Sequence, residues 1–104
     1  MSRGVQRCRL DSNHVAVMRA LRNVGMEPLS LANVGDGCPD IVVGFRGLNV
    51  LLEVKDGSKP PSERKLTAAE QEFQATWSGQ ICTVISPEAA VLAVLEHAKK
   101  CGAI

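Results

Sequence analysis

Aromatic residues are scarce in this chain. Of its 104 residues only Phe45, Phe73 and Trp77 are aromatic, and tyrosine is absent. Aliphatic side chains must therefore build the hydrophobic core. The scarcity also argues against a base-stacking platform of the kind that single-strand-binding proteins use.

Paired cysteines and long apolar runs are missing too. Four cysteines are present, Cys8, Cys38, Cys82 and Cys101, but none forms a C-x-x-C pair, and neither histidine has zinc-finger spacing to them. With no signal-peptide pattern, this predicts free thiols in a reducing cytoplasm. No apolar stretch is long enough to span a bilayer, so no membrane partner is expected.

A strong net charge is also absent, since the formal value is +1 at pH 7. The positive charges nevertheless form two clusters: Arg3, Arg7 and Arg9 at the N-terminus, and Lys55, Lys59, Arg64 and Lys65 in one central segment. The ordinary interpretation of such clusters is a solvated surface. The second cluster favours a phosphate-binding track, because it begins at the candidate site described below.

The length predicts one domain over residues 11–104, preceded by a basic arm over residues 1–10. Periodicity, caps and turn signals predict seven elements. They are a helix from 11 or 12 to about 23, strands over 28–34, 39–45 and 48–55, a helix over 67–78, a strand over 80–85 and a helix after Ser86. The fold class is therefore α/β, with a mixed four-stranded sheet flanked by helices.

Two helices carry readable sequence signals. The first has an apolar stripe at Val15, Met18, Leu21 and Val24. The second begins with a capping box, in which Thr67 and Glu70 satisfy each other's backbone N–H groups. We expect this second helix to bury the residues Ala69, Phe73 and Trp77.

Two acids stand inside apolar strand patterns, in Pro39-Asp40 and Glu53-Val54-Lys55. Unpaired carboxylates are costly in such surroundings. If residues 46–47 form a two-residue turn, Phe45 pairs with Leu48, and Asp40 then lies opposite Glu53 on one face of the sheet.

Side chains alternate along a strand, so Lys55 shares that face with Glu53. The lysine alone could neutralise the acids, as an ordinary surface ion pair of little energetic consequence. A Mg²⁺ ion explains the cluster better, with Asp40 and Glu53 as ligands, the Val54 carbonyl as a further ligand and Mn²⁺ as a substitute. Such an ion would polarise a phosphodiester and lower the pKa of a bound water, which Lys55 would orient.

These residues resemble the PD-(D/E)XK nuclease superfamily. Pro39-Asp40 matches its first half-motif, and Glu53-Val54-Lys55 matches its second. The stretches 37–44, 53–57, 65–67 and 70–71 are similar to small VRR-NUC and Holliday-junction-resolvase-like nucleases, many of them encoded by phages. The resemblance implies a restriction-endonuclease-like αβββαβ core with an extra C-terminal helix, metal binding by Asp40 and Glu53, and a catalytic Lys55.

The resemblance bears on three further residues. Gln71 matches a glutamine that often lines such sites, although it could equally be a solvated helix residue. Many relatives carry a metal-binding glutamate on the first helix, where this chain has Asn13 and His14. Either could be a weaker ligand, but helix capping is the more common role of a polar residue there.

The leading functional hypothesis is a Mg²⁺-dependent endonuclease for branched or junction DNA, in DNA repair or recombination. Its phosphate contacts would be Arg46, Lys59, Arg64 and Lys65. A homodimer in the cytoplasm of a bacterial or phage-infected cell would fit a two-fold symmetric junction. The alternatives are a non-catalytic DNA-binding or assembly module that keeps the fold, and a nuclease subunit that works only within a larger complex.

Overall fold

A computed structural model of the protein describes residues 12–104. The predicted basic arm over residues 1–10 and Cys8 lie outside the described residues. The elements are α1 (Ser12–Asn23), β1 (Glu27–Ser30), β2 (Ile41–Phe45), β3 (Leu48–Val54), a 3₁₀ turn (Pro61–Glu63), α2 (Ala68–Thr76), β4 (Gln80–Val84) and α3 (Pro87–Lys100). This order confirms the predicted α/β fold.

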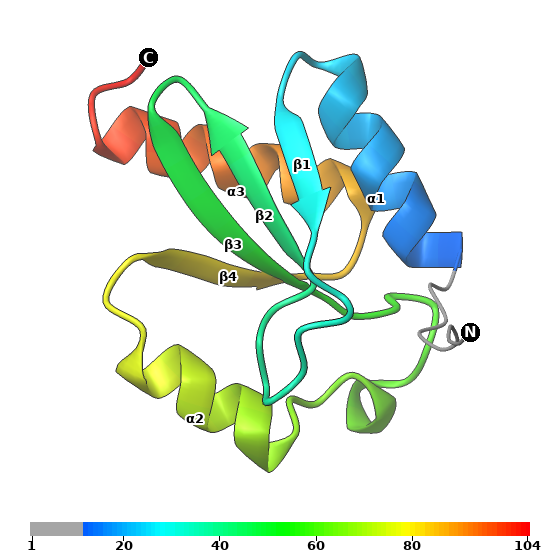
Figure 1. Ribbon diagram of the computed structural model, residues 1–104. Helices are drawn as coiled ribbons and strands as arrows, with labels where there is room; N and C mark the ends of the chain where they lie inside the picture. Colours follow the sequence, from blue (N-terminus) through cyan, green and yellow to red (C-terminus); the bar gives the residue numbers. More distant parts are fainter. Residues whose placement is uncertain (1–11) are drawn as a thin grey trace, which may run out of the picture.

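The four strands form one mixed sheet in the order β1-β2-β3-β4 (Figure 1). β1, β2 and β3 are antiparallel neighbours, whereas β4 runs parallel to β3. The β2–β3 register pairs Phe45 with Leu48 and Ile41 with Leu52, as the sequence predicts. Arg46 and Gly47 both have positive φ, at 51° and 85°. This is the conformation of a two-residue type I′ turn, which fixes that register.

One face of the hairpin forms the core. The side chains of Ile41, Val43, Val50 and Leu52 are fully buried, and they pack in one cluster with Val17 and Leu21 of α1 and with Ala90 and Val94 of α3. α3 crosses behind the sheet in Figure 1. Within residues 12–104, no helix has the length and apolar composition needed to cross a bilayer.

The buried face of α1 matches the predicted stripe only in part: Leu21 is buried and Met18 packs against the core, as predicted. His14, Val17 and Leu21 face the core, whereas Val15 is 43% exposed and Val24 51%. Both sets recur at helical spacing, and only the position of the sheet selects between them. The buried face was hard to recognise in the sequence because it includes His14, and a histidine is not counted as apolar when helical periodicity is assessed.

α2 is packed more loosely than predicted. It ends at Thr76, and none of its residues is buried. Trp77 adopts an extended backbone after the helix and is 46% exposed, with its ring stacked on Phe73 at 5.3 Å between centroids. The predicted burial of Ala69 and Trp77 is therefore wrong.

The loop between β1 and β2 reaches α2, as Figure 1 shows. Gly37 of this loop, with φ +77°, lies against the first turn of α2. A Cβ atom added there would overlap the Ala69 carbonyl group and lie 3.0 Å from the Glu70 nitrogen. Only glycine fits this position, since the backbone of the loop lies directly against the start of α2.

We expect Gly37→Ala to lower the free energy of unfolding by about 2–4 kcal/mol, because it adds both backbone strain and a steric overlap. Gly35→Ala is the matched control, since Gly35 has φ +80° but no atom within 4 Å of an added Cβ. Its expected cost is only about 1 kcal/mol. Urea unfolding of both variants measures the difference, and equal costs would show that the contact with α2 is unimportant.

Candidate active site

The open end of the β2–β3 hairpin brings Asp40 and Glu53 together. The Asp40 backbone N–H donates to the Leu52 carbonyl at 3.0 Å, which continues the ladder one residue beyond β2. The Asp40 Oδ2 atom accepts from the Val54 N–H at 2.7 Å. Besides burial, the charge of Asp40 and a side-chain hydrogen bond with it both raise the pKa of Glu53, which places the two carboxyl groups next to each other. The predicted carboxylate pair is therefore present on one face of the hairpin.

Glu53 is the buried member of this pair, at 3% exposure. Burial is the main reason why its pKa rises from 4.5 to about 8. Repulsion from Asp40 and Glu70 and the hydrogen bond to Asp40 raise it further, against the opposing effect of Lys55. Glu53 therefore keeps a proton near neutral pH unless a cation replaces it.

Lys55 reaches into the same cluster. Its Nζ atom lies 2.8 Å from the Oε1 atom of Glu70 and 3.6 Å from the Oε2 atom of Glu53. Burial lowers the pKa of Lys55, but the hydrogen bond and charge of Glu70, together with Glu53 and Asp40, bring it above its usual value. The lysine is therefore a permanent cation beside the two acids.

Glu70 is the residue that the sequence argument missed. The capping box is present as predicted: the Thr67 hydroxyl accepts from the Glu70 N–H at 3.1 Å, and Glu70 Oε1 accepts from the Thr67 N–H at 2.8 Å. The same carboxylate also holds Lys55. Burial raises the pKa of Glu70, but the bonds from Lys55 and Thr67 outweigh it, so the pKa is lowered.

The other site residues predicted near the cluster have different surroundings. Gln71 is exposed, and its side-chain amide donates to the Leu66 carbonyl at 3.2 Å. Asn13 donates from Nδ2 to the Lys55 carbonyl at 2.8 Å, so α1 supports the end of β3. His14 is buried in the interior at 5% exposure. The suggested role of the Val54 carbonyl stays a prediction.

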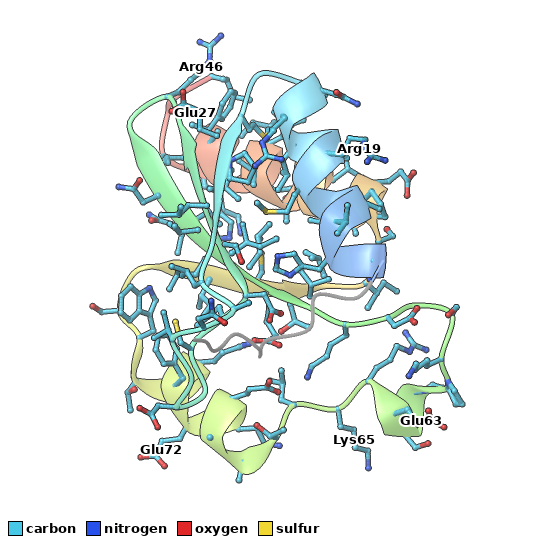
Figure 2. The ribbon with its side chains drawn as sticks, turned by 45° about the vertical axis from the view of Figure 1, so that its right-hand side comes forward. Arg19, Glu27, Arg46, Glu63, Lys65 and Glu72 are labelled. Carbon is cyan, nitrogen blue, oxygen red and sulfur yellow. The ribbon has the colours of Figure 1, made fainter. Side chains whose placement is uncertain are left out.

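The candidate phosphate contacts fall into two groups. Lys59, Arg64 and Lys65 belong to the segment that leads from Lys55 to α2, with the two lysines exposed. Arg46 lies at the hairpin turn, and Figure 2 shows it at the opposite end of the molecule from Lys65. At about 3.3 Å per residue, Arg46 is about 20 Å along β2 from Asp40.

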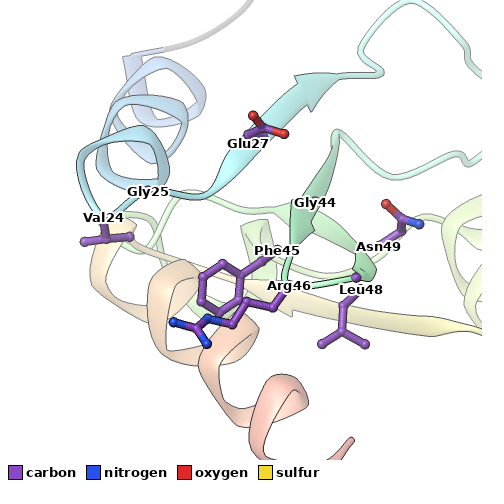
Figure 3. Close-up of a pocket in the computed structure, with 9 residues that line it drawn as sticks. Val24, Gly25, Glu27, Gly44, Phe45, Arg46, Leu48 and Asn49 are labelled. Atoms are coloured by element: carbon purple, nitrogen blue, oxygen red, sulfur yellow. The ribbon is translucent and has the colours of Figure 1, made fainter. Parts of the chain in front are cut away.

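The hairpin turn has a pocket of its own, of about 620 Å³. Figure 3 shows Arg46 beside Phe45 there, and the guanidinium carbon lies 5.6 Å from the ring centroid. Glu27 and Asn49 also line this pocket. The structure therefore separates Arg46 from the carboxylate cluster.

The donor atoms of the cluster suit a hard divalent cation such as Mg²⁺. Within residues 12–104, no group of three or more histidine, cysteine, aspartate or glutamate side chains is arranged to hold a metal ion. Mg²⁺ needs only one or two protein carboxylates, since water and substrate oxygens complete its shell. The Asp40–Glu53 pair supplies two hard oxygen donors whose mutual repulsion a divalent cation would remove. These residues therefore fit such an ion.

Comparisons with known proteins return no relative. No family model, no curated protein and no solved structure matches the chain. A function for this protein is therefore inferred from the chain's own residues and their geometry.

The raised pKa of Glu53 predicts a pH-dependent stability. The folded protein retains a proton up to about pH 8 that the unfolded chain releases near 4.5. The folded state thus binds more protons in this window, so its stability falls as the pH rises from about 4.5 to 8. Glu53→Gln removes this loss, and its stability gain over wild type should grow to the order of 2–4 kcal/mol by pH 8.5.

Urea unfolding at several pH values in EDTA measures this difference. Glu96→Gln, an exposed glutamate on α3, is the matched control and should follow wild type. A constant difference between wild type and Glu53→Gln over the whole pH range would contradict the assignment of a protonated, buried Glu53.

Proposed function

We propose that the protein is a divalent-cation-dependent DNA endonuclease that hydrolyses phosphodiester bonds. One observation carries the proposal. A buried glutamate is paired with an aspartate at the end of a hairpin, and a charged lysine lies beside them. A purely structural role does not explain this cluster, because an apolar residue in place of Glu53 would avoid the cost of a buried carboxyl group.

Each residue of the cluster has a distinct task in this reaction. Asp40 and Glu53 hold the cation, which supplies polarisation of the phosphodiester and activation of water when bound. Asp40 is kept in place by the Val54 N–H. Lys55 remains protonated, so its ammonium group can orient the attacking water and stabilise the negative charge that develops on the phosphate.

The surroundings of the cluster favour a substrate recognised by its backbone. Lys59, Arg64 and Lys65 follow Lys55 in sequence and offer contacts to phosphates, which position DNA without reading its bases. Their segment leads to α2, whose first turn already satisfies the N–H groups of Thr67 and Glu70 internally. The positive side chains, rather than helix N–H groups, would therefore bind the phosphates.

Branched or junction DNA is the substrate class that we propose. A duplex arm of about six base pairs spans the roughly 20 Å between the cluster and Arg46, so Arg46 could contact an arm that leads away from the cleaved strand. A homodimer would place two such sites on a two-fold symmetric junction. A binding module without catalysis would gain nothing from Asp40 and Glu53, because acids repel phosphate.

The catalytic test compares wild type with Asp40→Asn and Lys55→Ala on four-way junction, flap and linear DNA. We expect wild type to cut with Mg²⁺ or Mn²⁺ but not in EDTA, and each variant to lose at least about a hundredfold in rate. Lys100→Ala is the control, because it removes an equally long cation from the exposed end of α3. Circular dichroism confirms that each variant is folded.

Two results would reject the proposal. One is cutting by the Asp40→Asn and Lys55→Ala variants at the wild-type rate, which would point to a contaminating nuclease. The other is a folded wild-type protein that binds DNA but cuts none of the substrates with either metal. That second result would support the non-catalytic alternative.

The phosphate track predicts a separate effect on binding. In Ca²⁺, which permits binding but supports cleavage poorly, Lys59→Ala and Lys65→Ala should each weaken binding to all DNA shapes and reduce the salt dependence by about one released ion. Arg46→Ala should weaken binding only to DNA whose duplex is long enough to reach from the cluster to the hairpin turn. Anisotropy titrations at several salt concentrations measure both effects. Equal losses of affinity for short linear DNA in all three variants would contradict the separation of Arg46 from the track of Lys59 and Lys65.

A further inference from the structure

Two donors meet on a single oxygen of Glu70. The Lys55 ammonium and the Thr67 backbone N–H both donate to Oε1, each at 2.8 Å. Lys55 comes one residue after the end of β3, and Thr67 is the N-cap of α2. The Glu70 carboxylate therefore joins the end of the catalytic strand to the beginning of the helix.

This connection stands out because α2 has little else that holds it to the sheet. None of its residues is buried. A side-chain bond from Gln74 to Thr83 at 3.0 Å links it to β4, and the Gly37 loop contacts its first turn. The bond to Lys55 is thus a charged contact between this helix and the candidate active site.

We infer that Glu70 is a positioning residue that holds Lys55 away from Glu53. A lysine side chain has four rotatable bonds and can pair with either acid within reach. In the structure it is closer to Glu70, at 2.8 Å, than to Glu53, at 3.6 Å. If the charge of Glu70 were lost, the ammonium group would move toward Glu53, whose carboxyl oxygens can accept its hydrogen bond in either protonation state.

A shift of the Lys55 ammonium group toward Glu53 would impair catalysis, and this consequence rests on the proposed function. A lysine paired tightly with Glu53 would compete with the cation for that carboxylate, and it would no longer point toward the substrate. Glu70 would thus act through Lys55 without touching substrate or cation. The positioning contact itself exists whether or not the protein is a nuclease, so it can be tested separately.

Glu70→Gln is the sharpest variant, because glutamine also completes a capping box and keeps an oxygen for the Thr67 N–H. It removes the charge that holds Lys55 and leaves the helix start intact. Thr67→Ala is the matched control, since it removes the hydroxyl bond to the Glu70 N–H at 3.1 Å but leaves the carboxylate on Lys55. The two variants therefore separate positioning from helix capping.

The first measurement needs neither cation nor substrate. In full-length protein with ¹³C-labelled lysine, relaxation of the Cε group should show Lys55 as immobilised, in contrast to the exposed Lys59 and Lys65. We expect Glu70→Gln to shift the Lys55 signal and change its mobility, while Thr67→Ala leaves both unchanged. An unchanged Lys55 signal in Glu70→Gln, or a Lys55 as mobile as Lys59 in wild type, would overturn the inference.

The second measurement is cleavage kinetics on the substrate that wild type cuts best. Glu70→Gln should lower kcat about tenfold and raise the Mg²⁺ concentration needed for half-maximal rate, with KM for DNA nearly unchanged. Thr67→Ala should keep kcat while lowering the urea midpoint. Parallel losses of kcat and stability in both variants would show that Glu70 is merely structural. An inactive wild type with an immobilised Lys55 that responds to Glu70→Gln would reject the nuclease and retain the positioning contact.

Discussion

Burial of one face of the β2–β3 hairpin against α1 and α3 is the constraint on which the rest of the structure depends. Ile41 and Leu52 are a cross-strand pair, and both are fully buried. Because side chains alternate along a strand, this pair forces Asp40 and Glu53 onto the opposite face. A shift of one residue would expose the apolar set, so the core itself holds the two acids in register.

Asp40, Glu53 and Glu70 can lie close together because Glu53 carries a proton and the ammonium group of Lys55 supplies a positive charge. Glu53 is kept protonated by its burial, Asp40 is bonded to a backbone N–H, and Glu70 is bonded to Lys55. A different effect thus dominates at each carboxyl group. The cluster is costly to fold in the absence of a cation, and such a cost is typical of a site selected for binding or chemistry.

The approach of α2 to this cluster rests on contacts that are polar or backbone-mediated. Gly37 lets the loop before β2 pack on the first turn of the helix, and Glu70 bonds the helix to Lys55. An exposed helix of this kind can adjust its position at small cost in buried apolar area. The orientation of Lys55 is thereby linked to the loop that carries Asp40.

The hairpin, its register and the shared face of Asp40, Glu53 and Lys55 were determined by the sequence, because a two-residue turn and strict alternation leave a single arrangement. The capping box could also be predicted from the sequence, because it depends only on Thr67 and Glu70, which are three residues apart. The tertiary structure alone decided which stripe of α1 is buried and that Trp77 stays exposed, whereas the distance of Arg46 from the site follows from the length of the hairpin. The tertiary structure alone also brought Glu70 to Lys55, since that contact joins residues fifteen apart through the path of an irregular loop, for which no periodicity exists.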